Sequence, residues 1–367
     1  MSITIRSAGW WGGIAVAVAI SVLAGYAANW VGTALLGFDK SPISAIMMAI
    51  ILGMLLANTI KIPASLQAGL KFCTTFVLRV GIMLLGIRLS LLSAGQFTLV
   101  ALPFVVVAIA AGLLTVGLIG RYMGLSKQLS GLIAVGTSIC GCTAIVATAP
   151  LIKASEAEIS YSVACITIFG LAAMFVYPLL AHYAFADQPA LAGLFLGTSI
   201  HETAQVAGAG MMYEAQYNSP VALEFATVTK LVRNLCMIAV IPLVGILYGA
   251  ERRSGENGRI NYLAMVPWFI VGFAAMSAIR TIGDQGELAF GILPPAQWNY
   301  TVMILRDLAE QCLLVAMAAV GLTSMFAGMR NIGLRPFALG LFAALLVGGV
   351  SFALISAFAP GLVSMIG

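Results

Sequence analysis

The feature that most constrains this chain is a succession of long apolar runs. A helix needs about 20 apolar residues to cross the roughly 30 Å hydrocarbon core of a bilayer. Pro, Gly, Asn and Asp separate the runs, as expected of turns between helices. We therefore expect an all-α polytopic membrane protein with about eleven hydrophobic segments. These cover residues 11–36, 42–60, 70–92, 97–118, 129–151, 157–184, 189–214, 219–249, 262–282, 298–326 and 334–360.

The composition excludes a large soluble domain. Hydrophobic residues make up 61% of the 367 residues and charged residues 8%, whereas soluble domains contain about 25% charged residues. We expect residues 1–367 to form a single transmembrane domain. The first run, from Trp10 to about Leu36, is longer than the roughly 7–15 residues of a signal-peptide core, which favours a retained span. The basic residues lie in short separate loops, so we expect no nucleic-acid partner.

The distribution of Lys and Arg predicts the orientation. Cytoplasmic loops carry an excess of basic residues, which places the amino terminus in the cytoplasm and Gly367 outside, in the plasma or inner membrane. Segments 129–151 and 189–214 could each cross the bilayer or each return to the side they entered. The basic loops do not distinguish the two topologies, because two missing crossings cancel and leave every strongly basic loop on the same side. The loops on the expected cytoplasmic side hold Arg6, Lys61, Lys71, Arg121, Lys127, Arg252, Arg253, Arg259, Arg330 and Arg335, and the opposite loops hold Asp39, Lys40, Glu214, Asp284 and Glu287.

The tetrapeptide G-T-S-I occurs twice, at residues 136–139 and 197–200. Both copies fall in the middle of an apolar segment, where Gly and polar residues suit an interrupted helix that lines a cavity. Backbone N–H groups at such a break favour an anion. Alternatively, the hydroxyls bond back to their own helix and the glycines allow close helix packing. The candidate substrate-binding residues here are Thr137, Ser138, Gly141, Thr198 and Ser199.

The second copy continues into a pair of titratable residues, His201 and Glu202. An ionised carboxylate at bilayer depth costs about 2.5–3.5 kcal/mol, so it normally faces a cavity or a partner. We assign ion coupling, with H⁺ or Na⁺ as the ion, to His201, Glu202 and Gln205. The zinc-protease pattern H-E-x-x-H is incomplete here, because Gln205 stands where the second histidine would be. With two histidines in the chain, we expect no metal site and no cofactor.

Further charges lie within apolar segments. Lys230, Arg233 and Asn234 share one helical face at i, i+3 and i+4, where charge-assisted hydrogen bonds could hold an anion. The alternatives are a flank at the membrane surface or a pair with Glu224. We expect Arg79 and Arg88 to extend to the membrane interfaces, and Arg306 to pair with Glu310. The six cysteines fall almost entirely in apolar segments, which argues against a disulfide framework, and we interpret Cys140 and Cys142 as small packing residues.

Four motifs together resemble the YeiH-like sulfate exporter family, of the cation–proton antiporter/anion transporter superfamily. They are L-L-G-I-R-L-S-L, G-T-S-I-C-G-C-T-A-I-V-A-T-A-P, G-T-S-I-H-E-T-A-Q-V-A-G-A and V-T-K-L-V-R-N, and with them the resemblance covers nearly the whole chain. The resemblance implies a secondary transporter that exports sulfate or a sulfonate-like anion, with inverted repeats and two interrupted helices. We expect repeat halves at about 40–185 and 186–367.

The leading hypothesis is therefore an ion-coupled transporter of a small anion, with its site near the membrane midplane, and not an enzyme. Its partners are the anion and the lipid bilayer, and a homo-oligomer is left open. One alternative is a Na⁺/H⁺ antiporter without an anion substrate. The other is an intramembrane enzyme that uses His201 and Glu202, for which the sequence offers no recognisable nucleophile.

Overall fold

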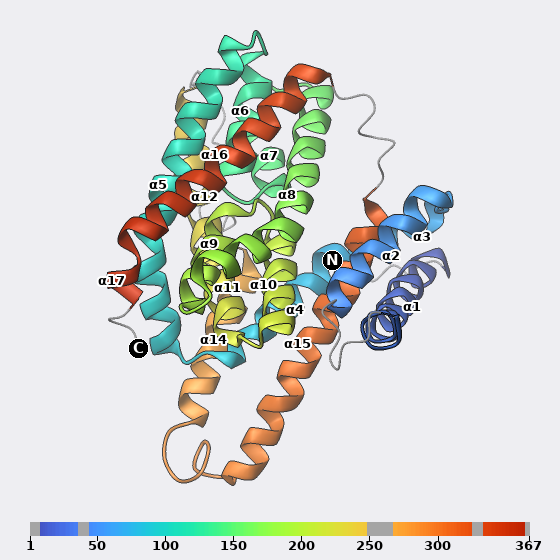
Figure 1. Cartoon of the computed structure of the whole chain (residues 1–367), viewed down its shortest axis with the longest axis vertical. Coiled ribbons are helices and arrows are strands. Elements are labelled where there is room, and N and C mark those ends of the chain that lie inside the picture. Colours follow the sequence, from blue (N-terminus) through green and yellow to red (C-terminus); the bar gives the residue numbers. More distant parts are fainter. Residues whose placement is uncertain (1–7, 36–43, 248–266, 325–332, 364–367) are drawn as a thin grey trace, which may run out of the picture. The chain divides into compact units, whose positions relative to one another are not determined.

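The computed structural model describes residues 8–35, 44–247, 267–324 and 333–363. Within these ranges the secondary structure is helical apart from one isolated bridge, between Ala289 and Leu293, which confirms the expected all-α class (Figure 1). The loop residues Arg6, Asp39, Lys40, Arg252, Arg253, Arg259, Arg330 and Gly367 lie outside the described residues, so the orientation of the termini stays a prediction.

Each of the eleven apolar segments corresponds to a helix or to a pair of helices. Among the described residues, six stretches are long and apolar enough to cross a membrane. The helices are α1 (Ala8–Trp30), α2 (Ala45–Thr59), α3 (Ala64–Phe72), α4 (Leu78–Leu85), α5 (Leu91–Tyr122), α6 (Lys127–Ser138), α7 (Cys142–Thr148), α8 (Glu156–Phe185), α9 (Pro189–Ser199), α10 (Thr203–Tyr217), α11 (Pro220–Leu235), α12 (Met237–Leu247), α14 (Trp268–Gly283), α15 (Pro295–Thr323), α16 (Leu334–Phe358) and α17 (Pro360–Val363).

The chain forms two compact units, which are described separately. Unit 1 comprises Met1–Ser93, Met211–Ser219 and Phe269–Arg330. Its helices pack through small residues: a Cβ on Gly53 of α2 would lie 2.7 Å from the carbonyl oxygen of Ala318 on α15. Such close backbone approach is typical of helices packed within a bilayer.

Unit 1 corrects two expectations about charged residues. The Arg88 side chain does not extend to an interface; it is 6% exposed and binds both carboxylate oxygens of Glu214 at 2.8 Å. Arg88 also binds Glu310 at 2.5 Å. Glu310 therefore pairs with Arg88 rather than with Arg306 one helical turn away. The i, i+4 rule failed here because a guanidinium from another helix lies closer to the carboxylate.

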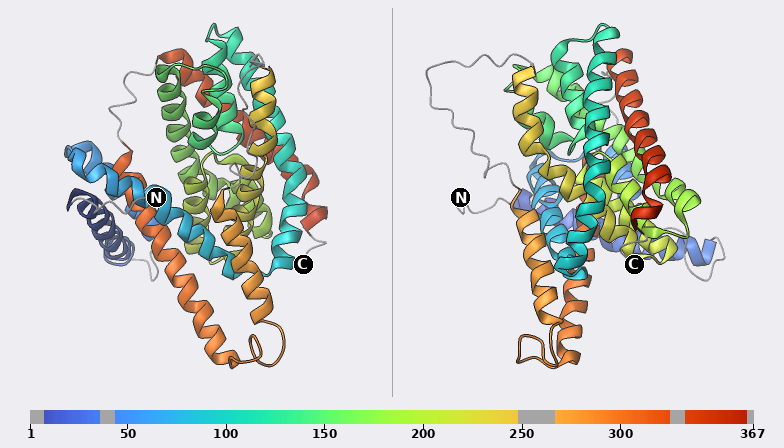
Figure 2. Two further views of the ribbon diagram at one scale, coloured as in Figure 1. Left: turned by 180° about the vertical axis from the view of Figure 1, so that it is seen from behind. Right: turned by 90° about the vertical axis from the view of Figure 1, so that its left-hand side faces the viewer.

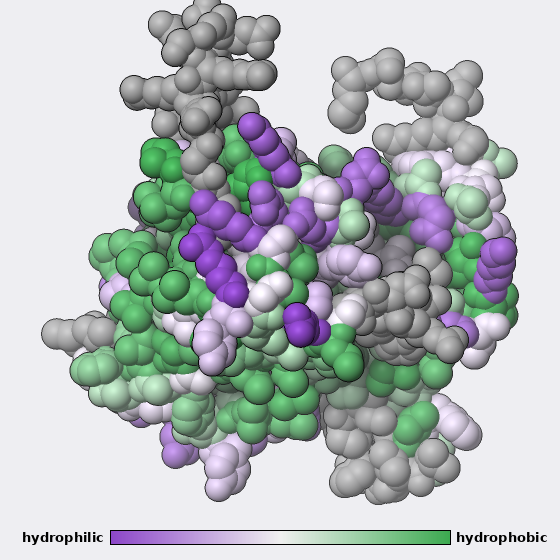
Figure 3. Space-filling view, turned by 90° about the horizontal axis from the view of Figure 1, so that it is seen from above, coloured by the Kyte–Doolittle hydropathy of each residue, from purple (hydrophilic) through white to green (hydrophobic). Residues whose placement is uncertain are grey.

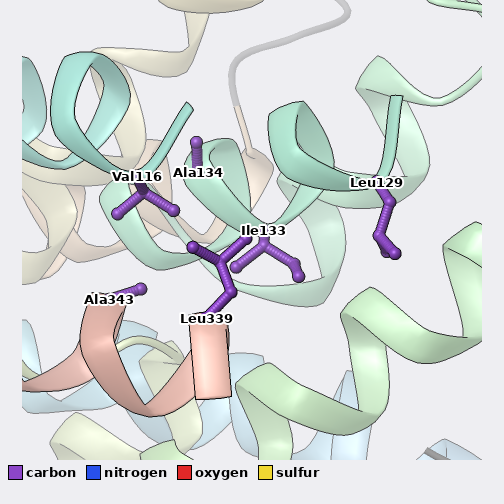
Figure 4. Close-up of a cluster of buried hydrophobic side chains, with 6 residues drawn as sticks. All are labelled: Val116, Leu129, Ile133, Ala134, Leu339 and Ala343. Atoms are coloured by element: carbon purple, nitrogen blue, oxygen red, sulfur yellow. The ribbon is translucent and has the colours of Figure 1, made fainter. Parts of the chain in front are cut away.

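Unit 2 comprises Ala94–Gly210, Pro220–Trp268 and Asn331–Gly367. Its long helices are α5, α8 and α16, together with the consecutive pair α11 and α12. A cluster of buried apolar side chains joins α5, α6 and α16 (Figure 4), and it consists of Val116, Leu129, Ile133, Ala134, Leu339 and Ala343. This packing fixes α6 against two long helices of the unit.

Segment 129–151 is a hairpin within unit 2. Ser126, which caps the start of α6, donates a hydrogen bond to Glu158 in the first turn of α8. The chain therefore enters α6 and reaches α8 at the same end of the unit. Ile145 of α7 lies against Gly136 of α6, where a Cβ would be 2.7 Å from the isoleucine Cδ1. We call α6 and α7 the first hairpin.

Basic residues gather at this end of unit 2. Arg121 lies in the last turn of α5, Lys127 begins α6, and Arg335 lies in the first turn of α16. Lys127 also donates to the carbonyl of Leu247, the last residue of α12, at 3.4 Å. We call this the basic end; it faces upward in Figure 1, and Figure 3, which looks onto it, shows hydrophilic side chains amid hydrophobic ones. The clustering agrees with the loops expected in the cytoplasm.

Segment 189–214 is a second hairpin, which enters unit 2 from the opposite end. Gly193 and Gly197 of α9 lie against Ala222 and Ala226 of α11, so α9 and α11 run in the same direction. Gly210 of α10 lies against Leu223, so α10 returns to the level at which α11 begins. From there α11 and α12 run to Leu247 at the basic end. The two hairpins therefore enter from opposite ends (Figures 1 and 2).

The contact between α9 and α11 should tolerate no added methyl group. In Gly193→Ala the Cβ would meet the backbone oxygen of Ala222 and would lie 2.8 Å from the Phe225 Cβ. Because backbone cannot move aside cheaply, we expect a loss of about 1–3 kcal/mol in stability, measured by thermal unfolding of the purified protein. Gly349→Ala is the control, since its Cβ meets nothing within 4 Å. An equal loss in both variants would contradict the packing argument.

Candidate functional site

The two hairpin tips meet in unit 2 around α11. Helix α6 ends at Ser138 and α9 ends at Ser199, so each helix stops at the serine of its G-T-S-I copy. The breaks predicted from the repeated tetrapeptide are thus confirmed. The last carbonyl groups of a helix have no partner within the helix, and a buried carbonyl without a hydrogen bond is costly. The two tips therefore need donors from elsewhere.

Lys230 of α11 supplies three of these hydrogen bonds. Its ammonium donates to the carbonyls of Ile139 and Ile200, both at 3.0 Å, and to that of His201. The side chain is 0% exposed. It therefore bridges the first hairpin to the second.

Arg233 lies one turn further along α11 and donates to both tips. Its Nε binds the Ser138 carbonyl at 2.8 Å, and its Nη1 binds the carbonyls of Thr198 at 2.7 Å and Ile200 at 3.1 Å. Its Nη2 binds the Thr137 carbonyl. Cations are favoured at helix C-termini by the helix dipole, and here two cations complement two such ends. We call residues 137–142, residues 198–205, Lys230 and Arg233 the tip site.

Most hydroxyls of the two G-T-S-I copies bond back to their own helices. Thr137 donates to the Ile133 carbonyl at 2.8 Å and Thr198 to the Leu194 carbonyl at 2.8 Å, and Ser199 donates to Phe195. Ser138 Oγ has no hydrogen-bond partner in the described part of the chain. Thr137, Thr198 and Ser199 are thus close to the tips, but each hydroxyl already donates its proton to a backbone carbonyl of its own helix and so has none left to donate to a ligand.

Glu202 of the second hairpin lies against the tip of the first. Gly141 has φ +71° and ψ −127°, and a Cβ there would lie 2.5 Å from the Glu202 Cγ. The Cys142 thiol donates to Glu202 Oε1 at 2.5 Å. Gly141 therefore makes room for a carboxylate of the same chain. The sequence predicts a packing role for Cys142, and the hydrogen bond to Glu202 corrects that prediction. The place of Cys142 beside Gly141 in C-G-C is the signal that could have indicated it.

Gln205 holds Glu202 in place by a helix-capping arrangement. The backbone N–H of Glu202 donates to Gln205 Oε1 at 3.2 Å, and Gln205 Nε2 donates to the Thr167 carbonyl of α8 at 3.3 Å. A glutamine at the third helical position that reaches back to the cap residue is half of a capping box. Gln205 thus positions the start of α10.

Two polar groups near the tips have unused hydrogen-bonding capacity. His201 is 1% exposed, and among the described residues neither of its ring nitrogens has a hydrogen-bond partner. Asn234 donates to Thr203 at 3.1 Å, whereas its Oδ1 has no partner in the described ranges. A buried polar group without a partner costs about 1–3 kcal/mol. Such groups are candidates for contact with a ligand.

The formal charges at the tip site are unequal. Lys230 and Arg233 are cations, and Glu202 is the carboxylate that touches the first hairpin. With Glu202 ionised and His201 neutral, one positive charge is left over. A buried region with excess positive charge favours an anion.

Comparison with known proteins gives the family. The family described as "Conserved hypothetical protein 698" matches residues 12–340. The chain is 33% identical over 345 residues to a UPF0324 membrane protein of Oceanobacillus iheyensis, covering 94% of both chains. It is 34% identical over 318 residues to the UPF0324 inner membrane protein YeiH of Escherichia coli, covering 83% of this chain and 84% of that one. This chain is therefore a multi-pass membrane protein that belongs to the YeiH-like UPF0324 family.

Proposed function

We propose that this protein is a secondary active transporter of a small anion, such as sulfate or a sulfonate, coupled to H⁺ or Na⁺. The observation that carries the proposal is the meeting of two hairpins that enter unit 2 from opposite ends. Each hairpin stops part of the way through the unit, and the two tips meet there around Lys230 and Arg233. Secondary transporters commonly hold their substrate at such interrupted helices, near the bilayer midplane.

The charge of the tip site supports an anion as the substrate. Two buried cations face one carboxylate, whereas a transporter of cations alone would need excess negative charge at this place. The candidate contacts are the groups that can donate a hydrogen bond and have spare capacity: the His201 ring and the Ser138 hydroxyl. In this assignment Lys230 and Arg233 supply the positive field while their N–H groups hold the tips together.

The test is transport by the purified protein in liposomes. We expect saturable uptake of radiolabelled sulfate into vesicles that contain the protein and none into empty vesicles, with competition by unlabelled sulfonates. The antiporter alternative predicts that Na⁺ moves protons when both sides lack sulfate and sulfonates, as read by an enclosed pH dye. Proton movement of that kind, without anion uptake, would overturn the proposal.

A substitution of His201 should reduce transport without reducing stability. Because its ring nitrogens have no hydrogen-bond partner within the described residues, His201→Met should keep or raise stability, by up to about 1 kcal/mol. If the imidazole donates to the anion, its loss should reduce sulfate uptake about tenfold or more, since a hydrogen bond to a charged group is worth about 1.5–3 kcal/mol. The control is His182→Met, in the last turn of α8, with uptake unchanged. Wild-type uptake by His201→Met would contradict this role.

A further inference from the structure

Six backbone carbonyls at the two tips accept hydrogen bonds from cations of the chain itself. Lys230 and Arg233 make seven hydrogen bonds to them, and the Ile200 carbonyl accepts from both side chains. The carbonyls belong to Thr137, Ser138, Ile139, Thr198, Ile200 and His201. Unwound carbonyls and helix C-termini of this kind are the groups with which interrupted-helix transporters coordinate Na⁺.

A Na⁺ ion would find neither ligands nor a favourable field at these carbonyls. Carbonyl oxygens must replace the hydration shell of the ion, and the oxygens here already accept hydrogen bonds from two cations. A Na⁺ ion at these oxygens would also lie next to two positive charges, which repel it. Lys230 and Arg233 therefore exclude Na⁺ from both tips.

Glu202 remains as a group whose charge can change. It accepts a hydrogen bond from Cys142 and lies in the space left by Gly141, so protonation would weaken its attachment to the first hairpin without requiring a coordination cage. The titratable and charged groups around it are Cys140 and Cys142 of the first hairpin, Lys230 and Arg233 of α11, and the neighbouring His201; α8 contributes the neutral Thr167 beside Cys142.

We propose that Lys230 and Arg233 permanently occupy the positions of coupling Na⁺ ions, and that a proton carried by Glu202 is the coupling ion. This inference rests on the proposed function. In each cycle the Glu202 carboxylate takes a proton from a hydronium ion on one side of the membrane, which becomes water, and gives the proton to a water molecule on the other side. No other covalent bond forms or breaks.

Transport by the wild-type protein gives the first test. Sulfate uptake into liposomes should proceed at the same rate when choline replaces Na⁺ at constant ionic strength. It should respond to an imposed pH gradient, and an enclosed dye should report protons moving with the anion. Uptake that requires Na⁺ and moves no protons would overturn the inference and leave the proposed function standing. Uptake that neither requires Na⁺ nor moves protons would overturn both, because no coupling ion would be left. Absence of uptake under every gradient would instead sink the proposed function and the inference with it.

The glutamate is tested by a variant that keeps an acceptor oxygen. In Glu202→Gln the ratio of uptake with and without the pH gradient should fall to one. Glu156→Gln, an exposed change in the first turn of α8, should keep the wild-type ratio. A ratio that still follows the gradient in Glu202→Gln would assign the proton to another group. If this variant has no uptake at all, the wild-type dye measurement decides.

The fixed cations are tested without transport. The melting temperature of the detergent-purified wild-type protein should be the same in NaCl and in choline chloride. Lys230→Ala leaves the carbonyls of Ile139 and His201 without a donor, while that of Ile200 keeps Arg233. This variant should melt lower and should regain part of the loss in NaCl but not in choline chloride, because a bound ion stabilises the folded state. Lys71→Ala, an exposed control in α3, should show no Na⁺ response. A Na⁺-specific shift in the wild-type protein would overturn the inference, even if Lys230→Ala does not fold.

Discussion

Arg233→Met should destabilise the protein by about 4 kcal/mol or more, because each orphaned buried carbonyl costs about 1–3 kcal/mol and relief from burying a charge offsets only part of that. Three carbonyls lose their donor, those of Thr137, Ser138 and Thr198, whereas the Ile200 carbonyl keeps its hydrogen bond from Lys230. The tips of both hairpins should separate, and anion uptake should be lost with them. The measurements are thermal unfolding and size-exclusion elution of the purified protein.

Two further variants separate the geometry of Arg233 from its charge. Arg233→Lys keeps the positive charge but not the planar fork, so we expect an intermediate loss of stability. Arg335→Met, at an exposed position in the first turn of α16, should leave stability close to that of the wild type. If Arg233→Met were as stable as Arg335→Met, the carbonyl contacts could not be holding the tips together.

Gly141→Ala has the second-largest expected effect, on stability and on coupling together. A side chain at φ +71° and ψ −127° is strained by about 1–3 kcal/mol, and the new Cβ would lie 2.5 Å from the Glu202 Cγ. Overpacking adds about 1–3 kcal/mol more, so we expect a loss of about 2–6 kcal/mol. Because the Glu202 carboxylate must move away from Cys142, the effect of a pH gradient on sulfate uptake should also weaken.

The matched control for this glycine lies inside α5. A Cβ on Gly117 meets nothing within 4 Å, and alanine is better than glycine in a helix by about 0.5–1 kcal/mol, so Gly117→Ala should be neutral or slightly stabilising. Unfolding of both variants in parallel gives the comparison. If Gly141→Ala had the same melting temperature as Gly117→Ala, the first hairpin could accommodate a side chain at its tip, contrary to this prediction.

The breaks in the two interrupted segments could be predicted because glycine and hydroxyl residues are costly in the middle of a lipid-facing helix. The sequence could not decide whether the segments cross the unit. Basic loops report only the parity of crossings, and two hairpins in place of two spans leave the parity unchanged. Contacts distant in sequence decided it, such as that between Ser126 and Glu158 and that between Gly210 and Leu223.

The site was predicted in part. Helical spacing placed Lys230 and Arg233 on one face of a helix, and their position within an apolar segment suggested that they do not lie at the membrane surface. Both side chains are buried in the structure, at 0% exposed. Their carbonyl partners could not be predicted, because backbone groups become available only where a helix breaks in three dimensions. Glu310 shows the same limit for side chains. The i, i+4 spacing predicted Arg306 as its partner, whereas in the structure Glu310 forms its ion pair with Arg88. The assignment of individual residues to substrate binding stays a prediction.

The separation along the chain between the hairpin tips and their donors has a consequence for biosynthesis. Lys230 lies 91 residues after Ile139, and Arg233 lies 96 residues after Thr137. At about 5–20 residues per second of synthesis, the first hairpin would wait roughly 5–20 s for its donors. With its tip carbonyls unsatisfied, that hairpin is poorly suited to lipid during this interval. We therefore expect it to stay in a wet or chaperoned environment until α11 emerges from the ribosome.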